Sequence, residues 1–135
     1  MGTIVRLCDW FGIKNLICSK NSVDCYNPKV VQASMGSIIR VKVHYVDLYK
    51  FIKNTSLPVF GAYMDGENVY KINLPNAGVL IMGNEANGIS EPIEQLISQK
   101  IAIPQFGLNQ NTESLNVATA TAILLSEFKR KSTEK

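Results

Sequence analysis

Apolar and polar positions alternate along this chain with two different periods. Near the N-terminus, Ile4, Val5 and Cys8 recur at helical spacing, and Gly12 follows them. Apolar residues spaced three and four apart mark the buried face of a helix, and a glycine commonly ends one. A helix is therefore predicted over Met1–Phe11.

Short apolar runs bounded by turn residues predict strands in the rest of the chain. The predicted strands are Asn15–Cys18, Ile38–Val43, Leu57–Tyr63, Ala77–Met82 and Lys100–Ile103. Helices are predicted after Pro28, Asp47 and Ser90 and from near Glu113 to about Lys131, and Asp65-Gly66 is predicted as a turn. Because Ala77–Met82 is apolar throughout, it is predicted to be a central strand buried on both faces. Strands that alternate with helices predict an α/β domain with a mostly parallel sheet.

Two phrases in the C-terminal third each run from a strand through a polar turn into a helix. The first is LIMGNEANGIS, from Leu80 to Ser90. Its Gly83 permits close approach of the backbone to a ligand, and Gly88 permits a second tight bend. Ligands bind at the ends of strands in open α/β sheets. A plain strand-to-helix turn accounts for this phrase equally well, because short glycine-rich motifs have many false positives.

The second phrase, from Ile103 to Phe128, places a polar cluster before a long helix. Ser114 and Asn116 fall in or just before its first turn, where free N–H groups and the helix dipole favour anionic ligand groups. Tight packing on the sheet would explain the alanines of the helix. It would not require the cluster Glu113-Ser114-Leu115-Asn116.

Composition narrows the class of protein. The chain has 135 residues, enough for one domain, with 46% hydrophobic and 19% charged residues. Since no apolar run approaches the roughly 20 residues of a membrane helix, no membrane partner is expected. Three cysteines without a CxxC spacing and a single histidine predict neither disulfides nor a metal site, and they favour the cytoplasm. The net charge of +3 permits an anionic partner.

Several motifs resemble those of a known family. GNEANG (Gly83–Gly88) and ESLNV (Glu113–Val117) resemble the second and third motifs of the SpoU (TrmH-like) RNA methyltransferases, in the SPOUT superfamily. GTIVRLCDWFG (Gly2–Gly12) is similar to the first motif of that family, and PKVVQASMG (Pro28–Gly36) to the segment that follows it. The motifs occur in the family's order and span nearly the whole chain.

The resemblance implies a fold and a function that composition does not. It implies an α/β domain over residues 1–135, with a mostly parallel sheet, helices on both faces and a C-terminal trefoil knot. It also implies binding of S-adenosylmethionine, a homodimer, and methylation of a ribose 2′-hydroxyl in tRNA or rRNA.

Carried over by position, the resemblance implies two sets of site residues. The catalytic set is Arg6, Glu85, Ser114 and Asn116, and the cofactor-binding set is Ala62, Gly83, Ile103, Ser114 and Leu115. Arg6 is expected to orient a phosphate and to stabilise the developing alkoxide. It is a poor general base because guanidinium stays protonated.

The first motif departs from the family pattern. The family's asparagine would lie two residues before Gly2, and the strand expected before it is also missing, so a truncated catalytic domain with an exposed apolar sheet edge is expected. The alternative function is a catalytically impaired cofactor- or RNA-binding fragment. A nucleotide-binding Rossmann domain is disfavoured, because no GxGxxG follows a first strand. Trp10 and Phe11 could stack on bases, although aromatic residues on helices more often lie in a core or a dimer interface.

Overall fold

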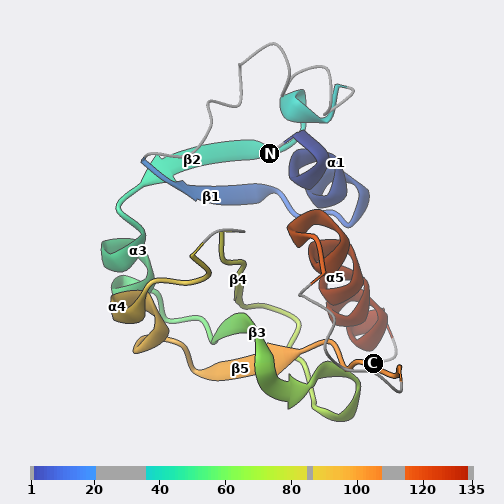
Figure 1. Ribbon diagram of the computed structural model, residues 1–135. Coiled ribbons are helices and arrows are strands. Elements are labelled where there is room, and N and C mark those ends of the chain that lie inside the picture. The colour runs from blue at the N-terminus through green and yellow to red at the C-terminus, as the bar shows by residue number, and fades with distance from the viewer. Residues whose placement is uncertain (1, 21–35, 85–86, 108–114, 134–135) are drawn as a thin grey trace. The chain divides into compact units, whose positions relative to one another are not determined.

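The computed structural model describes residues 2–20, 36–84, 87–107 and 115–133. The chain divides into two compact units, Met1–Phe51 and Ile52–Lys135 (Figure 1). Each unit contains parallel strands and a buried apolar cluster. The prediction of an α/β fold with parallel strands is confirmed.

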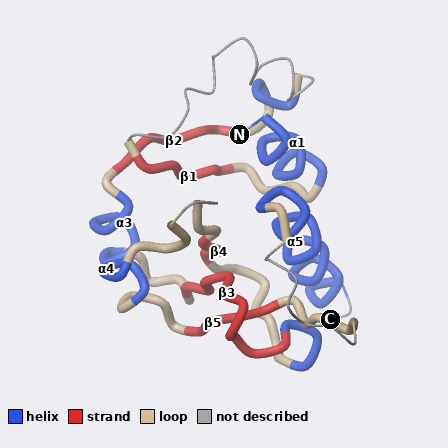
Figure 2. Tube along the Cα trace, viewed as in Figure 1, coloured by secondary structure: helices blue, strands red, loops and turns tan. Residues whose placement is uncertain are grey.

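The first unit joins a helix to a pair of strands. Its elements are α1 (Gly2–Trp10), β1 (Asn15–Ser19), the 3-10 helix η1 (Ser37–Ile39) and β2 (Lys42–Val46). β1 and β2 lie side by side and parallel, with Asn15 opposite Lys42 (Figure 2). Val5, Cys8 and Val41 form the buried cluster of this unit, which confirms the predicted apolar face of the first helix.

The end of α1 follows from its glycine. Gly12 has a φ of 70°, its N–H donates to the carbonyl of Asp9 (3.2 Å), and the N–H of Ile13 donates to that of Cys8 (2.7 Å). This pair of bonds is the Schellman arrangement, in which a left-handed residue satisfies the last helical carbonyls. Ile13 also packs against the cluster that contains Cys8, which supplies the apolar contact that usually accompanies the motif.

The predicted strand Ile38–Val43 is wrong in its position. Gly36 has a φ of 90°, and the N–H groups of Arg40 and Val41 both donate to the carbonyl of Ser37, so the chain turns where a strand was expected. The strand begins only at Lys42, where pairing with β1 becomes possible. Local apolar pattern cannot reveal that register.

The second unit is built on a three-stranded parallel sheet. Its elements are β3 (Val59–Asn68), the 3-10 helix η2 (Val69–Lys71), β4 (Val79–Ile81), the one-turn helix α4 (Glu91–Glu94), β5 (Gln99–Ala102) and α5 (Val117–Thr133). The strand order is β4-β3-β5. Helix α3 (Leu48–Asn54) contains the boundary between the units. As predicted, Asp47 caps it, because its Oδ1 accepts from the N–H of Lys50 (3.2 Å).

Two strand predictions in this unit are wrong. β3, not the Ala77–Met82 segment, is the middle strand of this sheet, and the three residues of β4 are half-buried. Asp65-Gly66 is not a turn but part of β3. The pairing register with β5 shifts between Ala62 and Glu67, and both residues lie opposite Ile101. A Cβ on Gly66 would lie 2.6 Å from the carbonyl carbon of Ile101, so the glycine lets the two backbones approach.

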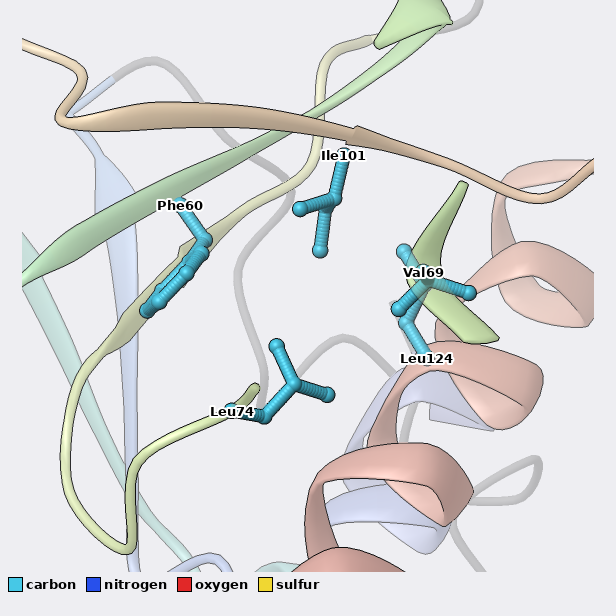
Figure 3. Packing of buried hydrophobic residues seen from close by; sticks show 5 residues of the cluster. All are labelled: Phe60, Val69, Leu74, Ile101 and Leu124. Carbon is cyan, nitrogen blue, oxygen red and sulfur yellow. The ribbon is translucent and has the colours of Figure 1, made fainter. Parts of the chain in front are cut away.

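One apolar cluster holds α5 on the sheet. Figure 3 shows its five buried side chains, which come from β3, η2, the segment before β4, β5 and α5: Phe60, Val69, Leu74, Ile101 and Leu124. Phe60 also meets Phe128 edge to face, with ring centroids 5.3 Å apart. Full burial of one such side chain stabilises a fold by about 1.5–3 kcal/mol. The cluster therefore fixes the strands relative to the helix.

The two predicted helices of this unit differ at their starts. α5 begins at Val117, whereas the prediction placed its start near Glu113, which lies outside the described residues. Ser90 precedes α4, but its side chain makes no capping hydrogen bond, and only its carbonyl accepts, from Glu94. The helix predicted after Pro28 lies outside the described residues.

Candidate functional site

The ends of β4 and β5 lie beside the middle of β3 and bring several predicted site residues to one edge of the second unit. Because β4 and β5 both run parallel to β3, their carboxyl ends lie at the same edge. Gly83 follows β4 by two residues, Ile103 directly follows β5, and Ala62 lies opposite Ile101. Ala62, Met82 and Ile103 also pack against the same buried cluster. The structure therefore places Ala62, Gly83 and Ile103 at a common edge.

The loop after β4 closes on itself. Asn84 and Gly88 exchange backbone hydrogen bonds (3.3 and 2.9 Å), and the Oδ1 of Asn84 accepts from the N–H of Asn87 (2.8 Å). A Cβ on Gly83 would lie 2.6 Å from the carbonyl carbon of Gly88, which itself has a φ of 66°. The positive φ of Gly88 agrees with the tight bend predicted there. The packing of Gly83 against the Gly88 backbone is a structural reason that sequence reasoning did not supply. Glu85 lies outside the described residues.

Asn116 caps the helix that follows β5. Its Oδ1 accepts from the N–H of Ala118 (2.8 Å), and its carbonyl accepts from the N–H of Ala120 (2.9 Å). Capping uses the oxygen of the side-chain amide, so the Nδ2 group is the donor that can meet a ligand. Leu115 beside it is 50% exposed, an apolar surface at the start of the helix. Ser114 lies outside the described residues.

Sequence reasoning missed a polar group next to Ala62. The hydroxyl of Tyr63 is buried and has no hydrogen-bond partner within the described parts of the chain. The Nζ of Lys100 lies 4.6 Å from the centroid of the Tyr63 ring and 3.1 Å from the Oε2 of Glu94. Burial, then the charge of Glu94, raises the pKa of Tyr63. Gly61 makes room for this ring, since a Cβ there would lie 2.8 Å from it. No local signal marks Tyr63, because the shift in pairing register after Ala62 is set by β5.

Arg6 belongs to the first unit. It is exposed on α1 and makes no ion pair with any residue that the structure describes. On the same helix, Asp9 accepts from Arg40 (2.7 Å) and from the hydroxyl of Ser37 (2.8 Å), which holds η1 against α1. The hydrogen bond from Arg40, then that from Ser37, lowers the pKa of Asp9. Of the predicted site residues, Arg6 alone lies outside the second unit.

Two other site types find no support in the described ranges. No group of three or more His, Cys, Asp or Glu side chains there is placed to hold a metal ion. No helix there is long and apolar enough to cross a membrane.

Parallel strands followed by a closed glycine–asparagine loop and by an asparagine-capped helix form the kind of strand edge at which α/β proteins bind ligands. The model of the SpoU rRNA Methylase family matches residues 1–126. The chain belongs to the SpoU rRNA Methylase family.

Relatives agree with this assignment. The tRNA (guanosine(18)-2′-O)-methyltransferase of Aquifex aeolicus is 31% identical over 98% of this chain and 64% of its own length. A protein of the TrmH family of RNA methyltransferases from Porphyromonas gingivalis has a solved structure with a TM-score of 0.89 and 42% identity, over 96% of this chain and 54% of that one. The SpoU methyltransferase AviRb from Streptomyces viridochromogenes, solved in complex with the cofactor AdoMet, has a TM-score of 0.87 and 26% identity, over 99% of this chain and 56% of that one. The chain spans about half the length of the first curated relatives it matches.

Proposed function

We propose that this chain binds S-adenosylmethionine and transfers its methyl group to a ribose 2′-hydroxyl of tRNA or rRNA. The observation that carries the proposal is the closed loop from Gly83 to Gly88 at the common edge of the parallel strands, in a chain of the SpoU family. Relatives are named as 2′-O-methyltransferases of tRNA and rRNA, and one was solved with AdoMet.

The residues at the strand edge fit such a cofactor. Gly83 and Ile103 offer backbone groups just after β4 and β5, and Ala62 lies beside the end of β5. Leu115 offers an exposed apolar side chain. Ser114 completes the proposed set from the sequence. Gly83 has no room for a Cβ, so a glycine at this position is needed for the loop to close. A closed loop of fixed shape suits a cofactor-binding site. When bound, the cofactor supplies the electrophilic methyl group on its sulfonium.

The proposed catalytic residues have two roles, which are to align the RNA and to stabilise the negative charge that develops on the ribose oxygen. Arg6 is exposed and makes no ion pair among the described residues. It would hold an RNA phosphate and stabilise the 2′-oxygen while a neighbouring acceptor, such as an RNA phosphate, takes the hydroxyl proton. Asn116 would donate through Nδ2 while its Oδ1 caps α5. Glu85 and Ser114 are proposed on their motif positions alone.

Further features of fold, assembly and location belong to the same proposal. We infer that the C-terminal part folds as a trefoil knot, that helices cover both faces of one sheet, and that two copies associate as a homodimer. We also infer action in the cytoplasm as one catalytic domain over residues 1–135. The order of the three sequence motifs supports the fold, the dimer and the domain, and three cysteines without a CxxC spacing support the cytoplasm.

Methylation and cofactor binding should be measured separately. The chain is incubated with RNA and methyl-labelled S-adenosylmethionine, and labelled dinucleotides that survive alkaline hydrolysis report 2′-O-methylation. Calorimetry reports cofactor affinity. Arg6→Ala should lower transfer by about 10²–10³-fold, the range for loss of one charge-stabilising group, while cofactor affinity is kept.

The control is Lys50→Ala, which removes an exposed basic side chain from α3 and should change neither measurement. Equal loss of cofactor affinity in Arg6→Ala would contradict the role of Arg6. Cofactor binding without any transfer by the unaltered chain would support the alternative function, a binding fragment. Absence of cofactor binding would overturn the proposal.

A further inference from the structure

Helix α1 exposes an aromatic side chain beside a cationic one. Trp10 is 84% exposed, and Arg6 is exposed one turn before it. Residues four apart lie on the same face of a helix. Val5 and Cys8 lie on the other face and are buried. Arg6 and Trp10 therefore form one exposed face, which we call the Arg6–Trp10 face.

The described residues of the unit that carries this face have a net positive charge. The acidic side chain of α1, Asp9, is held by Arg40 and Ser37, so its charge is compensated. The described residues of the first unit carry six basic and two acidic side chains, whereas those of the second carry six and five. The positive excess of the chain therefore lies mainly in the unit that carries Trp10, and it complements an anionic partner.

The exposed indole of Trp10 is a flat apolar surface that a binding partner can cover. Tryptophan offers a large aromatic surface that is mostly covered in folded proteins. A nucleobase stacks on such a ring whatever its sequence, and its phosphate pairs with a neighbouring arginine. A second copy of the chain fits less well. A two-fold contact through this face would bring Arg6 of one copy toward Arg6 of the other and would join two positively charged units, and opposed like charges are unfavourable.

We propose that the Arg6–Trp10 face binds a single-stranded segment of the RNA, with one unpaired base stacked on Trp10 and a nearby phosphate held by Arg6. The inference rests on the proposed function for its partner. It adds a residue, Trp10, that acts by positioning the RNA and that none of the motif roles includes.

The single tryptophan makes the inference directly measurable. Trp10 is the only tryptophan of the chain, so all indole emission comes from this face. A short single-stranded RNA of mixed sequence should quench that emission on binding. An oligomer of equal length made of abasic ribose phosphates should bind through charge alone and leave the emission nearly unchanged.

Substitutions separate stacking from charge. Trp10→Ala should weaken binding of the single-stranded RNA about tenfold, within the range measured for loss of one stacked base. Trp10→Phe should restore most of the affinity, because phenylalanine also stacks. Affinity for these variants is followed by anisotropy of labelled RNA. Tyr70→Ala, at an exposed aromatic side chain of the second unit, is the matched control and should leave affinity unchanged. Circular dichroism confirms that each variant is folded.

The outcomes are distinct. Quenching by the RNA but not by the abasic oligomer, with loss in Trp10→Ala and recovery in Trp10→Phe, supports the proposal. Equal quenching by both oligomers, or unchanged affinity in Trp10→Ala, overturns it. Emission that changes with protein concentration without RNA, together with a dimer that Trp10→Ala dissociates, overturns it in favour of a second copy. Absence of S-adenosylmethionine binding in calorimetry would instead contradict the proposed function. That measurement does not involve RNA, so the result for stacking on Trp10 would still stand.

Discussion

Gly83 shows how a single residue can be noticed in the sequence for one reason and required by the structure for another. Its place after an apolar run suggested close approach of a ligand, whereas the structure shows close approach of the Gly88 backbone. Gly61 and Gly66 are also packed too closely for a Cβ, against Ile97 and Ile101. Sequence can mark a glycine as special, but the neighbour that excludes the Cβ comes from elsewhere in the chain.

Gly83→Ala is expected to open the loop after β4. The added Cβ would lie 2.6 Å from the carbonyl carbon of Gly88, so backbone must move. We expect a loss of unfolding free energy of about 1–3 kcal/mol and of at least about tenfold in S-adenosylmethionine affinity. Urea unfolding and calorimetry measure the two. Gly12→Ala is the control. An alanine at this position would be strained by the φ of 70°, but no atom lies near the added Cβ. The Gly12→Ala protein should therefore lose stability and keep its affinity for S-adenosylmethionine.

The lowered pKa of Asp9 predicts that the free energy of unfolding depends on pH. Its pKa is lowered from 3.8 by the hydrogen bonds from Arg40 and Ser37. A carboxyl whose pKa is lower in the folded state stabilises the fold above the unfolded value and loses this effect as pH falls through the folded one. Asp9→Asn should therefore lower the urea midpoint at neutral pH. The difference should shrink once the pH falls below 3.8. A constant difference across this range would contradict the ion-pair explanation.

At the scale of elements, Asn116 at the start of α5 has two roles, a structural one as the helix cap and a proposed catalytic one as a hydrogen-bond donor. Local pattern placed the helix start near Glu113, but Asn116 caps it, so the described helix begins at Val117. Propensity alone does not choose among several polar residues as the cap. The capping atom and the proposed catalytic atom belong to the same side-chain amide.

Two substitutions at Asn116 test these roles. Asn116→Ala removes the cap and should lower the unfolding free energy by about 1 kcal/mol and abolish methylation. Asn116→Asp keeps a capping oxygen and suits the helix dipole, but it lacks the Nδ2 donor. It should therefore keep stability and still lose methylation. Full activity in Asn116→Asp would show that the donor has no role.

Lys131 ties the end of α5 to η2. Its Nζ donates to the carbonyl of Ile72 and lies 3.4 Å from that of Val69 and 3.5 Å from that of Tyr70. Lys131→Met keeps an unbranched side chain but removes this donor, so partly buried carbonyls lose their partner. We expect a loss of about 1–3 kcal/mol in urea unfolding. Lys71→Met, at an exposed lysine of η2, is the matched control and should change stability little. Equal losses of unfolding free energy in the two variants would show that the contacts of Lys131 with η2 do not stabilise the fold.

At the scale of the whole molecule, each of the two units has its own buried cluster. Val5 anchors the cluster of the first unit, and Leu124 anchors that of the second. Separate clusters predict separate responses to core substitutions.

Leu124→Ala should cost about 2–5 kcal/mol, and Val5→Ala about 2 kcal/mol. Chemical labelling of the buried Cys8 thiol reports the first unit, whereas far-ultraviolet circular dichroism reports mainly the long helix α5. Leu124→Ala should therefore shift the dichroism midpoint and leave the labelling midpoint nearly unchanged, and Val5→Ala should do the reverse. A single transition that both substitutions shift equally in both signals would contradict independent units.

The sequence by itself determined the class of fold, the family and most helix and strand locations. Apolar spacing marked the α1 face around Val5 and Cys8, and Gly12 marked its end, because these signals act within a few residues. The family motifs were also readable, since they are short and occur in order.

Only the tertiary structure decided what depends on partners distant in the chain. The start of β2 at Lys42 follows from pairing with β1, and the length of β3 follows from the double pairing with Ile101. The burial of the Tyr63 hydroxyl and the exposure of Trp10 were likewise not visible in local pattern. The physical reason is common to all four. Strand register, close approach and burial are set by the neighbouring element, and a local sequence pattern does not contain that neighbour.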